Sequence, residues 1–498
     1  MSLFRVKPLD QILSDASETT DQSLKRVLGA GDLIMLAIGA VIGAGIFGAI
    51  GTAAAGQTGP HGEIVRYGAG PALIFSFILL GGACALAALC YAELAAMIPQ
   101  AGSAYAYSYA TLGEIVAWII GWDLILEYAV GNVAVAISWG DYFKTLLRGF
   151  GITLPDWLST GYRTATQSAD PAVHGLLNSA PHVLGMPILV NIPAFAIVLV
   201  ITWLLLRGAR ESSTANNIMV MIKLAALTLF IGVGLMNIHP AYFTPFAPNG
   251  FTGVWQGGAI VFFAYIGFDA ISTAAEETKN PQRNLPIGIL GGLAICTLIY
   301  VIVGFVLTGM VPTKELAVAD PLAHALEVAG YSRVGWIVAL GAAVSMSAVL
   351  LVFQYGQPRI FFAMARDGLL PKWAARVDPK TRIPYMTTLV TGIVVAVWSA
   401  VGDAAETYDL TNIGTLFAFV LVCGGVLTLR VKDPERRRPF RVPAVWIIAP
   451  LGIVACVFFM WGLPVEAWER FGVWLVIGLA LYFTYGYQNS RLRRSSGE

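Results

Sequence analysis

Apolar residues occur in long uninterrupted runs along this chain, and shorter polar segments separate the runs. A helix needs about 20 apolar residues to cross the hydrocarbon core of a bilayer. The pattern predicts one helix for each of twelve runs: 33–55, 71–97, 115–140, 184–206, 215–236, 253–275, 286–311, 334–364, 385–402, 410–429, 444–462 and 471–488. The sequence therefore predicts an all-α polytopic membrane protein with twelve transmembrane helices.

The composition agrees with this pattern. Hydrophobic residues make up 57% of the 498 residues and charged residues only 12%, against about 25% charged residues in soluble proteins. No polar connection is long enough for a soluble enzyme domain, and the phosphate-binding pattern GxxxxGK[ST] does not occur. We therefore expect neither an enzyme nor a pump that hydrolyses ATP on this chain.

Positively charged residues are distributed unevenly between the two sets of connections. If the N-terminus is cytoplasmic, 22 of the 31 Lys and Arg residues lie on the cytoplasmic side and seven on the external side, with Lys223 and Arg359 inside spans. Short connections rich in Lys and Arg stay in the cytoplasm. We therefore predict a multi-pass protein of the cell (cytoplasmic) membrane with both termini cytoplasmic, residues 1–30 forming a leader and residues 489–498 a tail.

The composition gives no indication of a nucleic-acid, metal or cofactor site. The formal net charge is +1 and no basic stripe is present, so we expect no nucleic-acid partner. The five cysteines lie in or near apolar runs, and the five histidines are scattered through polar connections. Neither set has the spacing of metal ligands or of a disulfide framework. We expect no metal and no organic cofactor.

Two of the predicted spans contain residues that weaken a helix at mid-membrane depth. Span one has four glycines between Gly39 and Gly48, and in span six Gly267 is followed closely by Asp269. The two spans are five apart and cross in opposite directions, as expected of an inverted repeat. The predicted organisation is a first repeat at 31–240 (spans 1–5), a second at 241–432 (spans 6–10), and spans eleven and twelve at 433–488.

Such breaks have a chemical use. Unwound backbone in lipid costs on the order of several kcal/mol per unsatisfied group, so it is stable only where it lines a cavity. There it offers free N–H groups to a carboxylate and free C=O groups to an ammonium, the two charges of a free α-amino acid. The alternative is that the glycines only permit close helix packing, as in GxxxG motifs.

Three ionisable residues lie at membrane depth and are functional candidates: Lys223, Glu127 and Asp269. Lys223 either extends to the cytoplasmic surface or places an ammonium inside the bundle in place of a cation. Glu127 either makes a structural hydrogen bond or belongs to a proton relay. Asp269 either caps the second half of a broken helix or couples protonation to its rearrangement, and these two roles are compatible. Asp123 and Glu93 are weaker candidates.

Several motifs together resemble a known family. They are LKRVLG at 24–29, IGAGIF at 42–47, YAEL at 91–94 with Pro99, GSAY at 102–105, FFAYIGFD at 262–269, EETKNP at 276–281, YG at 355–356 with Arg359, and ARDGLLP at 365–371. Each motif is weak alone, but the set is specific. The chain resembles the cationic amino acid transporter family of the amino acid–polyamine–organocation superfamily, in particular its bacterial twelve-span members.

This resemblance implies a leucine-transporter-like fold with five-plus-five inverted repeats, broken helices one and six, and alternating access. It implies that the substrate carboxylate meets backbone N–H groups at Gly43, Ala44 and Gly45. The substrate ammonium would meet carbonyl groups near Val41, Phe263, Ala264 and Ile266. In proton-coupled relatives a lysine of span five occupies the region of the sodium ion, and Lys223 matches it. Glu127 and Asp269 match acids that such relatives use in coupling.

The chain also departs from the family pattern. Ala44 stands where many relatives have Ser or Thr, so no hydroxyl can contact the carboxylate there. The insertion around 61–66 and the connection 141–183 are longer than expected, which bears on external gating. No acid in span six or eight is evident at the pocket to hold a cationic side chain, and Phe353 would narrow a pocket that it faces. These features favour a small or medium neutral amino acid.

The resulting hypothesis is a secondary active transporter for amino acids that works by proton-coupled symport, with protons as the coupling ion. The alternatives are an amino acid exchanger that needs no proton and, in a different class, a membrane amino acid sensor. The expected partners are a free amino acid and the lipid bilayer. The sequence leaves open whether a small single-span subunit also binds.

Overall fold

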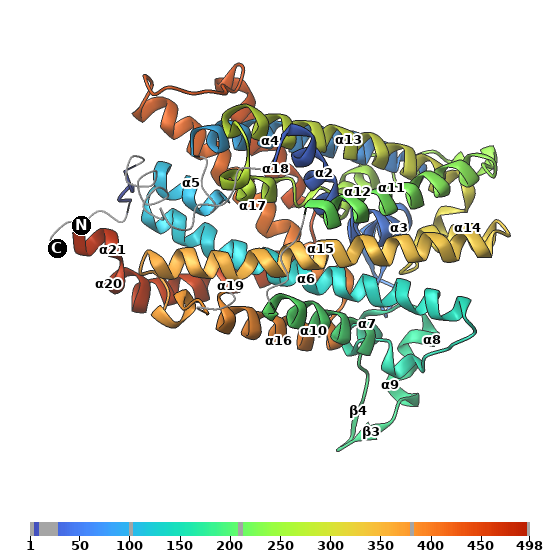
Figure 1. The fold of residues 1–498 in the computed structure, drawn as a ribbon. Helices are drawn as coiled ribbons and strands as arrows, with labels where there is room; N and C mark the ends of the chain where they lie inside the picture. Colours follow the sequence, from blue (N-terminus) through green and yellow to red (C-terminus); the bar gives the residue numbers. More distant parts are fainter. Residues whose placement is uncertain (1–3, 9–27, 99–102, 208–212, 379–382, 496–498) are drawn as a thin grey trace.

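The computed structural model describes residues 4–8, 28–98, 103–207, 213–378 and 383–495. Long helices lie side by side in one bundle (Figure 1). Most of the predicted leader, together with Pro99 and Gly102 of the family motifs, lies outside the described residues.

The first half of the chain contains two short helices at the first break and five further helices of the bundle. They are α2 (Ala30–Val41), a π-helical turn (Gly45–Ala49) with α3 (Ile50–Ala55), α4 (Leu73–Met97), α5 (Ser103–Thr111), α6 (Glu114–Gly149), α10 (Ile192–Leu206) and α11 (Ser213–Leu235). A hairpin of β1 (Gly56–Thr58) and β2 (Ile64–Tyr67) follows α3. Three short helices, α7 (Tyr162–Gln167), α8 (Pro171–His174) and α9 (Leu176–Ser179), form a cap after α6.

The second half begins with α12 (Gly250–Val261) and two 3₁₀ segments (Phe262–Tyr265 and Asp269–Glu277). The remaining helices are α13 (Pro281–Met310), α14 (Pro321–Val328), α15 (Ser332–Arg366), α16 (Tyr385–Val401), α17 (Ala404–Lys432), α18 (Val445–Trp461), α19 (Val465–Leu481), α20 (Tyr487–Asn489) and α21 (Arg491–Ser495).

Among the described residues, seven helices are long and apolar enough to cross a membrane, or nine if each of two bent pairs counts as one span. The bent pairs are α2 with the segment Gly45–Ala55, at 48°, and α18 with the helical segment from Val465, at 114°. The apolar helices α10 and α16 are shorter, with 15 and 17 residues. Each of the twelve apolar runs thus coincides with helical structure, although its length varies.

The predicted start of the fourth run is wrong. Residues 184–191 are not helical: β3 (His182–Val183) and β4 (Met186–Pro187) form a hairpin, and the helix begins only at Ile192. Asn191 caps this helix by accepting a hydrogen bond from the Ala194 N–H at 3.1 Å. A short apolar run does not by itself separate strand from helix, whereas Asn191 followed by a proline in the first turn is a helix start.

Helix contacts define the interior of the bundle. The most extensive packing joins α6 with α15, α4 with α13, α6 with α17, α17 with α18 and α2 with α13; α10 also packs on α16, α11 on α15 and α12 on α4. α6 is buried over most of its length, because it packs on both α15 and α17. The first and second breaks meet next to it, where the candidate site lies.

Candidate functional site

The first break separates α2 from the half-helix that starts at Gly45. Ile42 has an extended backbone, with φ −76° and ψ 103°, which ends the α-helix after Val41. Gly45 touches the backbone of Ala264 so closely that a Cβ atom there would collide with it. Glycine at position 45 is therefore required by the contact between the two breaks.

The second break follows α12. Ile266 is extended (ψ 137°) and Gly267 has φ +113°, a backbone conformation that favours glycine. A Cβ atom at Gly267 would lie 3.0 Å from the carbonyl carbon and oxygen of Ala40. The α-helical backbone is thus interrupted at both places, and the two interruptions pack on one another at two points.

The predicted carboxylate site lies at the start of the half-helix Gly45–Ala55. The first N–H groups of a helix have no partner within it, so the N–H groups at Gly43, Ala44 and Gly45 lie at the end that attracts anions. The N–H groups of Ile46 and Phe47 are already used, because both donate to the Gly43 carbonyl at 3.2 Å. All three predicted residues are buried.

The predicted ammonium site contains carbonyl groups that share one hydroxyl donor. The Tyr300 hydroxyl on α13 lies 3.0 Å from the Val41 carbonyl oxygen and 2.7 Å from that of Ala264. The Phe263 carbonyl accepts the N–H of Ile266 at 3.4 Å. A hydroxyl has one proton, so Tyr300 donates to one carbonyl at a time. Sequence reasoning missed Tyr300, since a tyrosine within an apolar span gives no signal of its partners.

Lys223 on α11 is fully buried and bound to the first break. Its Nζ atom donates to the carbonyl oxygens of Gly39 at 2.7 Å and Ile42 at 2.8 Å. The Ser345 hydroxyl on α15 donates to the same Ile42 oxygen at 2.8 Å. The side chain therefore does not extend to the membrane surface, and the ammonium occupies the interior of the bundle. Ser345 is a second residue that sequence reasoning missed.

Three buried acids lie near the breaks. Glu127 and Asp123 are one turn apart on α6, and Glu127 is within electrostatic reach of both Asp123 and Asp269. Asp269 is buried at the start of the second 3₁₀ segment, and its Oδ1 atom has no hydrogen-bond partner among the described residues.

Asp123 is more isolated than its neighbours. Neither of its carboxylate oxygens has a hydrogen-bond partner among the described residues, and its exposed fraction is 0%. Gly414 on α17 leaves space for it, because a Cβ atom there would lie 2.6 Å from Oδ1 of Asp123. Sequence reasoning ranked Asp123 below Glu127, yet its surroundings are equally enclosed.

An ion pair connects the β1–β2 hairpin to α17. Arg66 pairs with Asp409 at 2.5 Å, and both side chains are buried. The preceding residue on α17, Tyr408, packs its ring 4.6 Å from that of Phe263 and bonds the hydroxyl of Ser138. The insertion that follows span one therefore contacts the second break through two consecutive residues of α17.

Polar networks also close the opposite end of the bundle. Lys7 pairs with Asp367 at 3.1 Å, and the Tyr105 hydroxyl donates to the same carboxylate at 2.8 Å. The buried carboxylate of Glu93 pairs with Arg430 at 2.6 Å and Arg438 at 3.3 Å. Glu93, a weak functional candidate from the sequence, therefore has a structural role.

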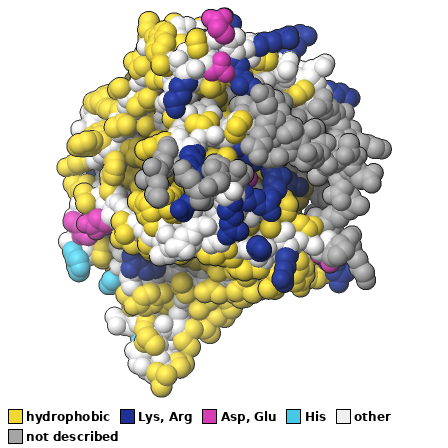
Figure 2. Space-filling model, turned by 90° about the vertical axis from the view of Figure 1, so that its left-hand side faces the viewer, with side chains coloured by type: hydrophobic (Ala, Val, Ile, Leu, Met, Phe, Trp, Pro, Cys, Tyr) yellow, Lys and Arg dark blue, Asp and Glu magenta, His cyan; other side chains and the backbone are white. Residues whose placement is uncertain are grey.

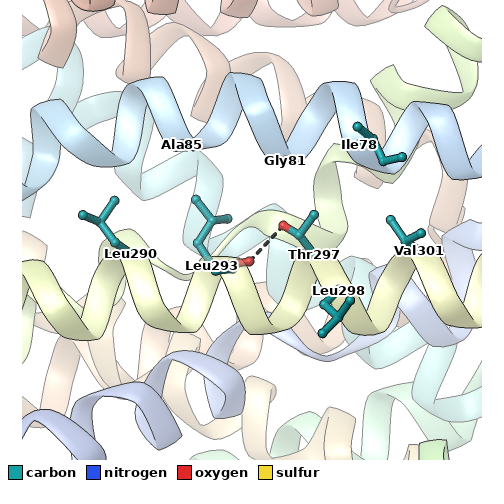
Figure 3. Close-up of a pocket in the computed structure, with 9 residues that line it drawn as sticks. Ile78, Gly81, Ala85, Leu290, Leu293, Thr297, Leu298 and Val301 are labelled. Atoms are coloured by element: carbon teal, nitrogen blue, oxygen red, sulfur yellow. Dashed lines mark hydrogen bonds between the residues drawn. The ribbon is translucent and has the colours of Figure 1, made fainter. Parts of the chain in front are cut away.

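A cavity of about 490 Å³ lies between α4 and α13, away from the breaks (Figure 3). Its lining is apolar apart from Thr297, whose hydroxyl donates to the Leu293 carbonyl at 2.8 Å. The exposed side chains of Ile78 and Leu298 place it at the outer surface of the bundle. Its lining contains no charged group for a zwitterion, so we do not assign the substrate to it.

The described part of the chain contains no group of three or more His, Cys, Asp or Glu side chains placed to hold a metal ion. The five cysteines are unpaired and buried. The candidate site is therefore built from backbone groups at two breaks, one ammonium and three carboxyl groups.

Comparison with known proteins identifies the class to which this arrangement belongs. The model of the amino acid permease family matches residues 28–482. The chain belongs to this family, whose members are membrane transporters and not enzymes.

Individual relatives cover nearly the whole chain. A methylthioribose transporter of Bacillus subtilis is 43% identical over 99% of this chain and 100% of its own length. The branched-chain amino acid permease BcaP of the same organism is 44% identical over 99% of each chain. The vacuolar cationic amino acid transporter 4 of Arabidopsis thaliana is 36% identical over 87% of this chain and 68% of its own.

Proposed function

We propose that the protein is a proton-coupled symporter of small or medium neutral amino acids in a bacterial cytoplasmic membrane, working by alternating access. The observation that carries the proposal is the Lys223 ammonium, which donates to two carbonyl groups at the end of α2. A fixed cation at this position can replace a bound metal cation and stabilise the break by the same electrostatic interaction.

The proposed architecture has twelve spans in a leucine-transporter-like fold, with inverted repeats at 31–240 and 241–432. The pattern of helix contacts supports it. In the proposed repeats, the counterparts of α2, α4, α6, α10 and α11 are α12, α13, α15, α16 and α17, in that order. When each helix is replaced by its counterpart, the packed pair α2–α13 becomes α12–α4, and α11–α15 becomes α17–α6. The pairs α6–α15 and α10–α16 are unchanged, and all of these pairs are in contact. This symmetry is what two inverted repeats of five spans produce.

The proposed topology places both termini in the cytoplasm. The Lys and Arg distribution supports it, and so do contacts at one end of the bundle. Lys7 pairs with the Asp367 side chain, and the Arg491 N–H donates to the Asp367 carbonyl at 3.0 Å. The chain segments near the two termini thus lie on the same side.

In the proposed site, a substrate carboxylate binds the N–H groups at Gly43, Ala44 and Gly45. Its ammonium binds carbonyl groups among Val41, Phe263, Ala264 and Ile266. Tyr300 does not block this mode, because each carbonyl oxygen has two lone pairs and can accept a second donor. The absence of a side-chain hydroxyl at Ala44 leaves carboxylate recognition to the backbone.

The proposed coupling uses Glu127 and Asp269 as proton carriers near the second break, with Lys223 holding the first. Inward movement of one proton down the membrane potential contributes about 2.3 kcal/mol per 100 mV. Protonation of Asp269 would remove a buried negative charge at the second break, within electrostatic reach of Glu127. The break could then change conformation.

The relatives sharpen the choice of substrate. BcaP is named as a branched-chain amino acid permease, and its 44% identity favours a branched-chain neutral amino acid here. Methylthioribose is a second candidate, because the transporter named for it is 43% identical. Methylthioribose has neither carboxylate nor ammonium, so the two sets of backbone groups would find no charged partner in it.

The test is uptake of labelled leucine and labelled methylthioribose into proteoliposomes. We expect leucine to accumulate when a pH gradient or an inside-negative potential is imposed. Accumulation that persists with both abolished contradicts proton coupling. Counterflow that requires internal amino acid identifies an exchanger, and saturable binding without any flux identifies a sensor.

A further inference from the structure

The connection between α6 and α10 contains a segment with an unusual composition for an exposed loop. Residues 171–190 include no Asp, Glu, Lys or Arg. Aqueous segments have about 25% charged residues, so about five would be expected in twenty positions. The segment therefore has the composition of a membrane-facing surface although it lies outside the helices of the bundle.

The apolar side chains of this segment gather at the tip of the hairpin β3–β4. Val183 pairs with Met186 across the hairpin, and Leu184 and Gly185 form the turn between them. The exposed fractions are 55% for Val183, 94% for Leu184 and 68% for Met186. Three neighbouring apolar side chains thus point away from the rest of the protein.

The turn contains a residue that its backbone does not favour. Leu184 has φ +51° and Gly185 has φ +79°, so both central residues of a two-residue turn have positive φ. Such turns strongly prefer Asn-Gly or Asp-Gly, and a bulky residue there is disfavoured. Because its side chain is 94% exposed, Leu184 makes almost no packing contacts within the protein that could offset this conformational cost. The leucine therefore makes sense only through a contact outside this chain.

The position of the hairpin indicates what that contact is. In Figure 1 the hairpin projects sideways from the bundle, at right angles to the long helices and beside α10 and α16. In Figure 2 the same projection, at the bottom of the view, is covered mainly by hydrophobic side chains. Exposing apolar side chains to water is unfavourable, so an apolar tip that projects to the side of the bundle is expected to contact lipid.

The base of the hairpin is fixed to the lipid-facing helices. The Ile188 N–H donates to the Pro181 carbonyl at 2.8 Å, and the Asn191 N–H donates to the carbonyl of Ala400 at 2.7 Å, near the end of α16. Ile192 at the start of α10 and Val397 near the end of α16 are exposed on the outer surface of the bundle. The base of the hairpin therefore adjoins exposed apolar side chains of α10 and α16.

We propose that the hairpin β3–β4 is a membrane anchor whose tip, formed by Val183, Leu184 and Met186, inserts at the boundary between headgroups and acyl chains. The occupant of this surface is phospholipid. Assignment to the outer leaflet rests on the proposed topology, but contact with lipid does not depend on the transported substrate or the coupling ion. Interfacial segments bind in this way through buried apolar area.

A fluorescence experiment on the full-length protein in nanodiscs tests the anchor. The five native cysteines are buried, so an environment-sensitive thiol dye can be attached to Leu184→Cys. Glu327→Cys, on the exposed face of α14, is the matched control. We expect the dye at 184 to emit at shorter wavelength and to be quenched several-fold more by lipids with nitroxide-labelled acyl chains than the dye at 327.

Equal quenching at both positions, with equal access to iodide in solution, overturns the proposal. Intermolecular disulfide cross-linking of Leu184→Cys that does not decrease as lipid is added also overturns it, because the occupant is then a second copy. Neither result depends on transport activity. The leaflet is determined in a separate experiment: a membrane-impermeant quencher is added to one side of proteoliposomes, and the loss of fluorescence from the dye at 184 shows on which side the tip lies.

A second variant tests the role of Leu184 without endangering the turn. Leu184→Asn places the preferred residue at a positive-φ position, so the hairpin is expected to form at least as well. With the dye on Met186→Cys, we expect Leu184→Asn to shift emission to longer wavelength and to reduce lipid quenching several-fold. Unchanged quenching in this variant contradicts an anchor centred on Leu184.

Discussion

The Nζ atom of Lys223 lies 2.8 Å from the carbonyl oxygen of Ile42, the residue at which α2 becomes extended. A carbonyl group at the end of a broken helix has lost its place in the helical hydrogen-bond pattern. The ammonium of Lys223 and the hydroxyl of Ser345 both donate to it. The conformation of the first break is therefore connected to the charge of one side chain on another helix.

Lys223→Met should separate binding from coupling. The change keeps an unbranched side chain but removes donors to two carbonyl groups, and a hydrogen bond to a charged group contributes about 1.5–3 kcal/mol. We expect gradient-driven uptake to fall by about tenfold or more, since 1.4 kcal/mol corresponds to a factor of ten. Ser345→Ala removes a neutral donor to Ile42 and should reduce uptake less. Full gradient-driven accumulation by Lys223→Met would refute the role of the ammonium.

Tyr300→Phe should slow transport while leaving the fold intact. It removes the hydroxyl next to the Val41 and Ala264 carbonyls but keeps the ring packed on Phe77. The loss of one neutral hydrogen bond costs about 0.5–1.5 kcal/mol. The control is Tyr265→Phe, whose hydroxyl bonds the Phe77 carbonyl at 2.9 Å. Transport rates should fall more for Tyr300→Phe at similar unfolding temperatures; identical rates would count against a positioning role.

The ion pair between Arg66 and Asp409 should show non-additive effects on stability. Removing one partner leaves the other charge buried, which costs about 3–5 kcal/mol, whereas replacing both partners by apolar residues costs much less. Arg66→Met and Asp409→Leu should each lower the unfolding temperature in detergent more than the double variant does. Arg163→Met, which breaks a more exposed pair with Glu406, should have a smaller effect. Additive losses in the double variant would contradict a buried pair.

Asp320, in the connection that precedes α14, should give the protein a pH-dependent stability. Burial raises the pKa of its carboxyl group above the ordinary value of 3.8, although a hydrogen bond from Thr145 opposes this. The folded state therefore holds the proton more tightly, and stability from this group is present at low pH and is lost as pH rises through the folded pKa. Asp320→Asn should reduce the decline in unfolding temperature as the pH rises above the ordinary pKa of an aspartate, about 4. Parallel pH profiles would contradict this assignment.

The sequence predicted features that depend on local composition. Long apolar runs predicted the helices, and Gly45 and Gly267 identified the breaks because glycine weakens a helix wherever it lies. Lys223 was found because a charge inside an apolar run is rare. Each of these signals is readable from a residue and its immediate neighbours.

Contacts between distant parts of the chain could not be predicted in this way. Arg66 and Asp409 are 343 positions apart, and Tyr300 is 259 positions from Val41. An arginine in a connection and a tyrosine in a span have many ordinary roles, so nothing local distinguishes these two. The error at 184–191 has a different cause. Hydropathy reports where apolar residues are exposed to lipid or buried, but not whether the backbone there is helical.

The contact of Gly45 with the backbone of Ala264 has a mechanical consequence. With Gly267 lying against Ala40, each broken helix touches the other at a position where no side chain separates the two backbones. Such surfaces leave no soft layer of rotating side chains to absorb a relative displacement. The position of the half-helix Gly45–Ala55 is therefore coupled to that of the second break by direct contact between backbones.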